Sequence, residues 1–149
     1  MNEAGEPEAT VAQNLIRLLG TEDASDNAHD ATQAAERVFE AMRIRLSLVL
    51  GAGGFSTLLA RSLTLSRPAF PWLTQIVPDK FGSVAGRLEA VSREQIASEV
   101  TSGFASVLTR FTDLLTTFIG ADLTDRLLTA VFNDLEDGAA YRMRGDNNL

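Results

Sequence analysis

The chain has 149 residues, no cysteine and a formal net charge of −7, from 13 basic and 20 acidic residues. This length fits a single domain with a core that needs no disulfide, flanked by flexible tails over residues 1–7 and 137–149. The lack of cysteine excludes thiolate metal sites. The acidic balance, without any basic run, argues against a nucleic-acid partner, because a phosphate backbone would be repelled.

The N-terminal segment MNEAGEPEAT is acidic, whereas a secretory leader begins with positive charge followed by an apolar stretch. The longest segment without charged residues, Leu46–Ala60, has 15 residues and three glycines. A membrane-spanning helix needs about 20 apolar residues. We therefore expect a soluble, cytoplasmic protein that does not bind a membrane, in keeping with the absence of cysteine.

Three helices are expected in the first half of the chain. Apolar residues at helical spacing predict the first over residues 8–19, which Gly20 ends. The polar segment over residues 21–30 is typical of a loop. The spacing then predicts a second helix over about residues 30–50 and a third over residues 55–66.

Gly51–Gly54 lies between the second and third predicted helices and is a candidate cofactor loop. A dinucleotide fingerprint needs G-x-G-x-x-G after a strand, but Ser56 holds the third glycine position and a helical pattern precedes the motif. A phosphate loop needs a lysine, and none is nearby. We interpret the segment as a joint between two core helices, where glycine adopts conformations closed to other residues. Anion binding at the N-terminus of the next helix is the alternative.

PAFPWL, residues 68–73, begins an irregular, proline-rich connection. Its prolines end the third helix. Phe70 and Trp72 are predicted to plug the bundle, or else to mark a partner surface or a ligand mouth. A short β hairpin over residues 74–91 is an alternative to irregular chain within this connection.

A long helix is predicted from Ser92, an N-cap with Gln95 completing a capping box, to Ile119. Its apolar stripe is wider than a coiled-coil seam, which favours burial inside a bundle. Gly120 ends this helix, and Asp122 is expected to cap the last one. The predicted fold is an all-α bundle of about five main helices.

His29 is the only histidine. One histidine without cysteine cannot build the common zinc sites. Its neighbours, AHDATQAAE, lack the lysine and glycine typical of a phosphotransfer domain. The chain also has no G-x-S-x-G motif, so a serine hydrolase lacks its parts. We interpret His29 as a solvated surface residue.

Carboxylates are frequent in the C-terminal third, and Glu36 and Glu40 repel each other four residues apart on the second predicted helix. The segment DLEDG lacks the alternating ligands of a calcium loop, and no Glu-x-x-His pair exists for a di-iron site. We interpret these carboxylates as helix caps and solvated faces, and predict no catalytic residue, metal or cofactor. The C-terminal group comprises Asp113, Asp122, Asp125, Asp134, Glu136 and Asp137.

The helix pair LLTTFIGADLTDRLL, residues 114–128, is similar to helical segments of bacterial multidomain signalling proteins. This resemblance implies a signalling-related role. The missing catalytic parts and the long apolar helix favour a non-enzymatic module that binds another protein or forms a homodimer. The predicted interface residues are Phe70, Trp72, Val100, Phe104, Val107 and Phe111.

A sensor whose bundle encloses a small apolar ligand is the alternative function. The eight phenylalanines, with the small residues Gly103, Ala105 and Gly51–Gly54, would shape its cavity. An enzyme is the third choice, and it would have to use Asp, Glu, Arg or hydroxyl groups that the sequence does not single out.

Overall fold

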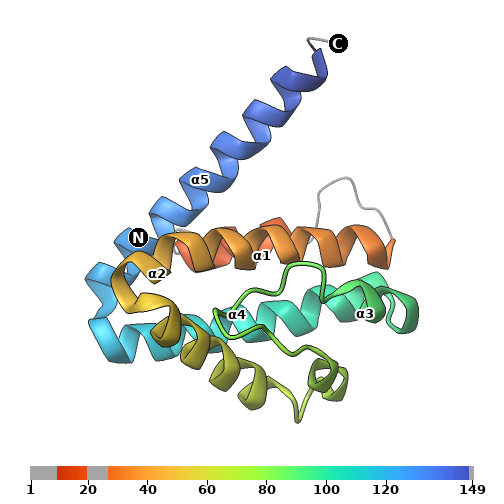
Figure 1. Cartoon of the computed structure of the whole chain (residues 1–149), viewed down its shortest axis with the longest axis horizontal. Coiled ribbons are helices and arrows are strands. Elements are labelled where there is room, and N and C mark those ends of the chain that lie inside the picture. The colour runs from red at the N-terminus through yellow and green to blue at the C-terminus, as the bar shows by residue number, and fades with distance from the viewer. Residues whose placement is uncertain (1–9, 20–26, 148–149) are drawn as a thin grey trace, which may run out of the picture.

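The computed structural model describes residues 10–19 and 27–147, with side chains as far as Gly138. The tail over residues 1–7 and Gly20 lie outside the described residues. The described part is all-α and contains no strand, which confirms the predicted fold class. Its elements are α1 (Val11–Leu19), α2 (Ala28–Ser66), the 3₁₀ helix η1 (Pro71–Gln75), α3 (Glu89–Glu94), α4 (Ala97–Ile119) and α5 (Ala121–Asn147) (Figure 1).

Helix α1 begins at a capping box that the sequence analysis missed. The Thr10 backbone N–H donates to Gln13 Oε1 over 2.9 Å, and the Gln13 N–H donates to Thr10 Oγ1 over 3.1 Å. These two bonds satisfy N–H groups that would have no partner at the start of a helix. The cap fixes the helix start at Val11, three residues after the predicted one.

Helix α2 consists of two helical stretches joined at Gly51, as the glycine-rich motif predicted. Gly51 has φ 78° and ψ 159°, a conformation essentially reserved for glycine, while the rest of α2 is helical. Figure 1 shows the resulting change of direction. The residues that lead into the bend, from Ala28 onward, are helical, whereas a dinucleotide fingerprint follows a strand.

The predicted start of the long helix at Ser92 is wrong. Ser92 lies inside α3, and its hydroxyl donates to the Glu89 carbonyl oxygen over 2.6 Å instead of accepting a backbone N–H from the first turn of a new helix. Gln95 is extended, with φ −118° and ψ 148°, and ends α3. Helix α4 therefore starts at Ala97. In the segment 74–91, where a β hairpin was an alternative, η1 and α3 cover the two ends and residues 76–88 between them contain no strand.

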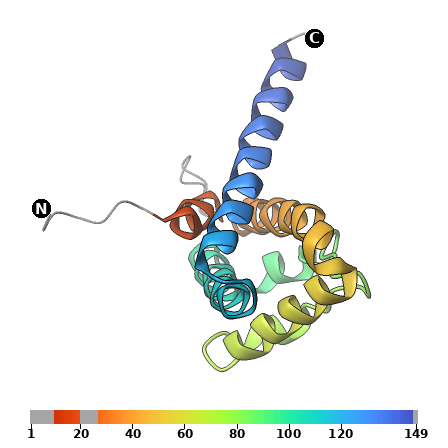
Figure 2. The ribbon, with the colours of Figure 1, turned by 90° about the vertical axis from the view of Figure 1, so that its left-hand side faces the viewer.

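Helix α5 follows α4 after a one-residue corner at Gly120, which has φ 89°. It begins at Ala121, so Asp122 lies in its first turn rather than at its cap, and pairs with Arg126 over 3.0 Å. The helix continues to Asn147, through residues 137–147 that were expected to form a flexible tail. Figures 1 and 2 both show its second half extending away from the other helices.

The core lies between α2, α4 and the connection that joins them, and buried leucine and valine side chains of α1 and α5 complete it. Phe39 and Phe104 pack with tilted rings whose centroids are 5.8 Å apart, and Trp72 meets Phe104 edge-on at 5.6 Å. Trp72 is 8% exposed, so it closes the bundle as the plug that the sequence analysis favoured. Its ring lies against Gly103 of α4, where an added Cβ would overlap the indole.

Glu36 and Glu40 hold this connection onto α2. Glu40 Oε2 accepts hydrogen bonds from the Ser83 hydroxyl and the Val84 N–H, both over 3.0 Å. Glu36 Oε1 accepts the Gly86 N–H over 2.9 Å. The like-charged pair is therefore tolerated because each carboxylate receives backbone donors from a segment more than forty residues away in sequence.

Candidate functional site

The residues predicted to form an interface lie in the core of the described structure. Phe70 is half-buried, and the other five are between 0% and 8% exposed. A contact surface needs accessible side chains, so these residues contribute packing within the bundle instead. The five buried residues are Trp72, Val100, Phe104, Val107 and Phe111.

Large exposed apolar side chains are scattered over the described surface, and four of them flank two corners of the backbone. Leu48 and Val49 precede the bend of α2 and are 78% and 51% exposed. Phe118 and Leu123 flank the α4–α5 corner and are 70% and 40% exposed. Figure 2 looks onto the end of the molecule where both corners lie. We call these four side chains the corner surface.

Helix α2 is long and apolar enough to span a membrane, judged by length and composition alone, and no other helix among the described residues is. Only 28% of the most apolar 18-residue stretch of α2 is buried inside the fold. A core helix of a soluble protein can be equally long and apolar, but it is mostly buried. This stretch of α2 is not mostly buried. The fold thus leaves a substantial part of this apolar stretch uncovered.

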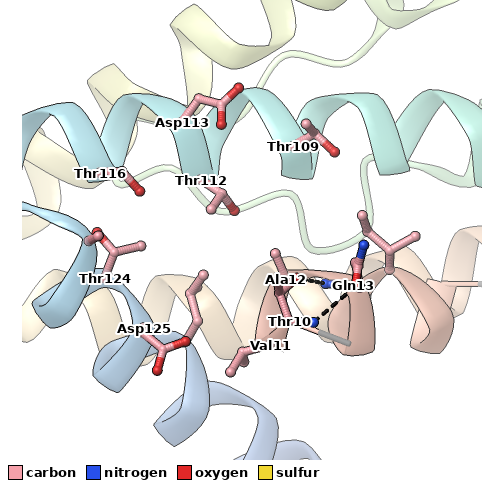
Figure 3. Close-up of a pocket in the computed structure, with 13 residues that line it drawn as sticks. Thr10, Val11, Ala12, Gln13, Thr109, Thr112, Asp113, Thr116, Thr124 and Asp125 are labelled. Carbon is pink, nitrogen blue, oxygen red and sulfur yellow. Dashed lines mark hydrogen bonds between the residues drawn. The ribbon is translucent and has the colours of Figure 1, made fainter. Parts of the chain in front are cut away.

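A groove of about 450 Å³ lies between α1, α4 and the first turns of α5 (Figure 3). Apolar side chains from α1 and α5 line part of it, among them Val11, Ile16 and Leu128. Asp113 and Asp125, which were predicted to be caps or solvated residues, line this groove from α4 and α5 and are exposed. Its threonines come from α4 and α5 as well as from the α1 cap: Thr10, Thr109, Thr112, Thr116 and Thr124.

A second groove of about 390 Å³ separates α2 from α5 and is lined by Ile44 and Leu135, among others. Next to it, Arg45 donates two hydrogen bonds to the carboxylate of Asp134, over 2.8 and 3.0 Å. This hydrogen bonding, together with the opposite charge, raises the pKa of Arg45. The pair holds the described first half of α5 against α2.

The remaining candidates are dispersed. His29 is 43% exposed in the first turn of α2, and its Nδ1 lies 3.4 Å from Glu89. Glu136 and Asp137 are exposed on α5. Within residues 10–19 and 27–147, no cluster of three or more histidines and carboxylates is arranged to hold a metal ion. Gly51 and Gly53 face open space and line none of the grooves described above.

Sequence reasoning missed both the corner surface and the threonine groove. A signal for the first was present: residues 46–60 and 114–121 are uncharged, and each contains a glycine at a helix boundary. The groove left a weaker signal, since threonines at positions 109, 112 and 116 share one face of a helix.

Comparisons with protein-family models, with curated proteins and with solved structures found no match to this chain.

Proposed function

We propose that the protein is a non-enzymatic helical interaction module that self-associates through the corner surface. The observation that carries this proposal is that exposed apolar side chains flank two backbone corners, which lie at the same end of the molecule. Single exposed apolar residues are ordinary, but grouped ones mark contact sites. The absence of cysteine fits a cytoplasmic setting for such a module.

Charge favours a second copy of the chain as the occupant. The protein carries a net charge of −7, so most of its faces repel another copy. The corner surface is the exception, because the segments 46–60 and 114–121 contain no charged residue. Asp122, next to Leu123, is the nearest carboxylate and is paired with Arg126. A two-fold axis would make the contact self-complementary.

The extension of α5 beyond the bundle is a second reason to expect a partner copy. Helices shorter than about 12–15 residues are marginal in water when nothing packs against them. The outer part of α5 has no neighbouring helix in either view (Figures 1 and 2). The outer part of α5 extends away from the α4–α5 corner, so a partner that covers it would contact the protein beyond the corner surface.

Sedimentation velocity over a concentration series tests this proposal. A self-associating module of micromolar affinity is expected to shift from monomer to dimer between about 1 and 500 µM. A protein that remains strictly monomeric over this range contradicts the proposal. A second result would also contradict it: a protein that stays monomeric without lipid but co-sediments with lipid vesicles. That result would assign the apolar corner to a membrane.

A further inference from the structure

Arg67, the residue that follows the last turn of α2, is a partly buried cation without a counter-charge. Its Nε atom is buried and donates to no acceptor. Among the described residues, the side chain of Arg67 forms neither a hydrogen bond nor an ion pair. Withdrawing a guanidinium from water without giving it acceptors costs free energy. Arg67 thus has donors that the fold leaves unused.

Most other arginines in the described part of the chain have a partner. Arg45, for example, pairs with Asp134. The remaining described arginines without a partner are exposed, so water solvates them: Arg61, Arg93 and Arg110. The chain has 20 acidic residues, yet no described carboxylate forms an ion pair with Arg67. The missing counter-charge is therefore a local feature of the fold and does not reflect a shortage of carboxylates.

Arg67 lines a groove of about 230 Å³ between the second stretch of α2 and the connection that returns along it. The connection lies close to this helix, because a Cβ added at Gly82 would be 3.2 Å from the Cα of Ser56. On the α2 side the groove runs from Ser56 to Arg67, about 16 Å along the helix axis. Its apolar walls are Ala60, Leu63, Ile76, Val77 and Pro78. A groove this long for its volume, with a cation at one end, suits a straight chain with one terminal anion.

The surroundings of the groove favour an anion despite the negative charge of the whole protein. No described carboxylate lines the groove, and residues 41–78 contain four arginines and no acidic residue. Asp79 follows directly, but its carboxylate accepts the N–H groups of Phe81 and Ser83 within its own turn, over 2.8 and 2.9 Å. The local field therefore has the opposite sign to the net charge of −7.

We propose that this groove binds a straight-chain monocarboxylate, that is, a short fatty acid. The carboxylate accepts hydrogen bonds from the terminal Nη groups of Arg67, since only Nε is fully buried. The alkyl chain extends from there along Leu63 and Ile76 toward Ser56. This binding is independent of self-association, because no residue of the corner surface lines the groove.

Nuclear magnetic resonance titration of the full chain with sodium octanoate tests the proposal. Saturable shifts are expected at the amides of Ala60, Thr64 and Val77, which line the groove, and the affinity should fall as salt is added. Shifts confined to the corner surface, at Leu48 and Phe118, would assign octanoate to that surface and overturn the site. The absence of saturable shifts in the groove would overturn it as well.

Related probes separate the charged end of the ligand from its chain. Octanol and octylammonium have the same chain without the negative charge, and both are expected to bind at least about fivefold more weakly than octanoate. From butanoate through hexanoate to octanoate, the affinity should rise about two- to fourfold for each methylene that is buried. Equal affinity for octanol and octanoate would overturn the assignment of an anion. An affinity that does not change with chain length would overturn the assignment of the apolar walls.

Arg67→Met separates ligand binding from a structural role. Methionine keeps an unbranched apolar stem, and Arg67 has no partner to lose, so the variant should unfold at nearly the same urea concentration as the parent. It should nevertheless bind octanoate no more tightly than octanol. Arg67→Lys keeps the charge without the planar fork, so its affinity for octanoate should lie between those of the parent and of Arg67→Met.

Arg61→Met is the matched control, because Arg61 is an exposed arginine on the same helix that does not line the groove. It makes the same change in net charge and should retain the preference for octanoate over octanol. An equal loss in both methionine variants would show unspecific attraction and overturn the proposal. A folded Arg67→Met variant that still prefers octanoate would also overturn it.

Discussion

The indole of Trp72 packs on the backbone of Gly103, at a place on α4 where no side chain fits. A Cβ built on Gly103 would overlap the indole, with Trp72 Cη2 at 2.7 Å. Trp72 in turn meets Phe104 edge-on, with centroids 5.6 Å apart. The connection can therefore pack this closely against α4 only because residue 103 is a glycine.

Gly103→Ala is expected to destabilise the protein by about 1–3 kcal/mol, because the methyl group forces the Trp72 ring out of its position. Urea unfolding followed by the fluorescence of the single tryptophan measures the loss. Gly53→Ala is the matched control, since its added Cβ meets no atom within 4 Å. At that exposed helical site alanine should add up to about 1 kcal/mol of stability. A Gly103→Ala variant as stable as the parent would refute the packing described.

Gly51→Ala tests the joint of α2. At φ 78° and ψ 159° an alanine is strained, which should cost about 1–3 kcal/mol. The added methyl group itself meets no neighbour, so a loss of stability reports backbone strain alone. Far-ultraviolet circular dichroism and urea unfolding together give the answer. A rise in helical content with undiminished stability would show that α2 straightens easily and that the joint is not required.

Glu40→Ala is expected to release the connection from α2. The carboxylate accepts hydrogen bonds from Arg43 Nε, the Ser83 hydroxyl and the Val84 N–H, each over 3.0 Å. Their loss should cost about 1–3 kcal/mol and accelerate hydrogen exchange at Val84. Glu36→Ala removes a bond to Gly86 only, so it should accelerate exchange there and leave Val84 protected. Unchanged protection of Val84 in Glu40→Ala would contradict the assigned role.

Acid should weaken the turn around Asp79. The N–H of Ser83, and also that of Phe81, donates to this carboxylate, and these bonds lower the pKa of Asp79 below its ordinary value of 3.8. A lowered pKa in the folded state adds stability above about pH 4, which is lost as the pH falls toward the folded pKa. Urea unfolding at several pH values should therefore show a less steep acid loss for Asp79→Asn than for the parent. Parallel pH curves for the two proteins would contradict this linkage.

The helices were predictable wherever one periodic pattern ran between clear stop signals. The bend at Gly51 followed from a helical pattern on both sides of a glycine cluster, and the corner at Gly120 from a glycine between two stripes. The start of α4 was not predictable in the same way. Ser92 and Gln95 have the spacing of a capping box, but the hydroxyl of Ser92 bonds to the preceding turn.

The candidate surfaces were less predictable because they depend on which apolar residues remain uncovered. The stripe of Val100, Phe104 and Phe111 has the strongest pattern in the chain and is fully used by the core. Leu48 belongs to an equally apolar segment but points outward at the bend. Asp113 and Asp125 line the same groove only because the chain changes direction between α4 and α5 at Gly120.

Sedimentation velocity on paired corner variants tests the central claim most directly. Leu48→Glu and Phe118→Glu place a charge on the corner surface and are expected to leave the protein monomeric at about 500 µM, where the parent is dimeric. Ile96→Glu is the matched control, because Ile96 is as exposed as Phe118, 70%, but precedes α4 at its other end, about 35 Å away. Loss of the dimer in both corner variants and its retention in Ile96→Glu is the predicted result. A dimer that survives both corner substitutions, or is lost equally in the control, would contradict the account.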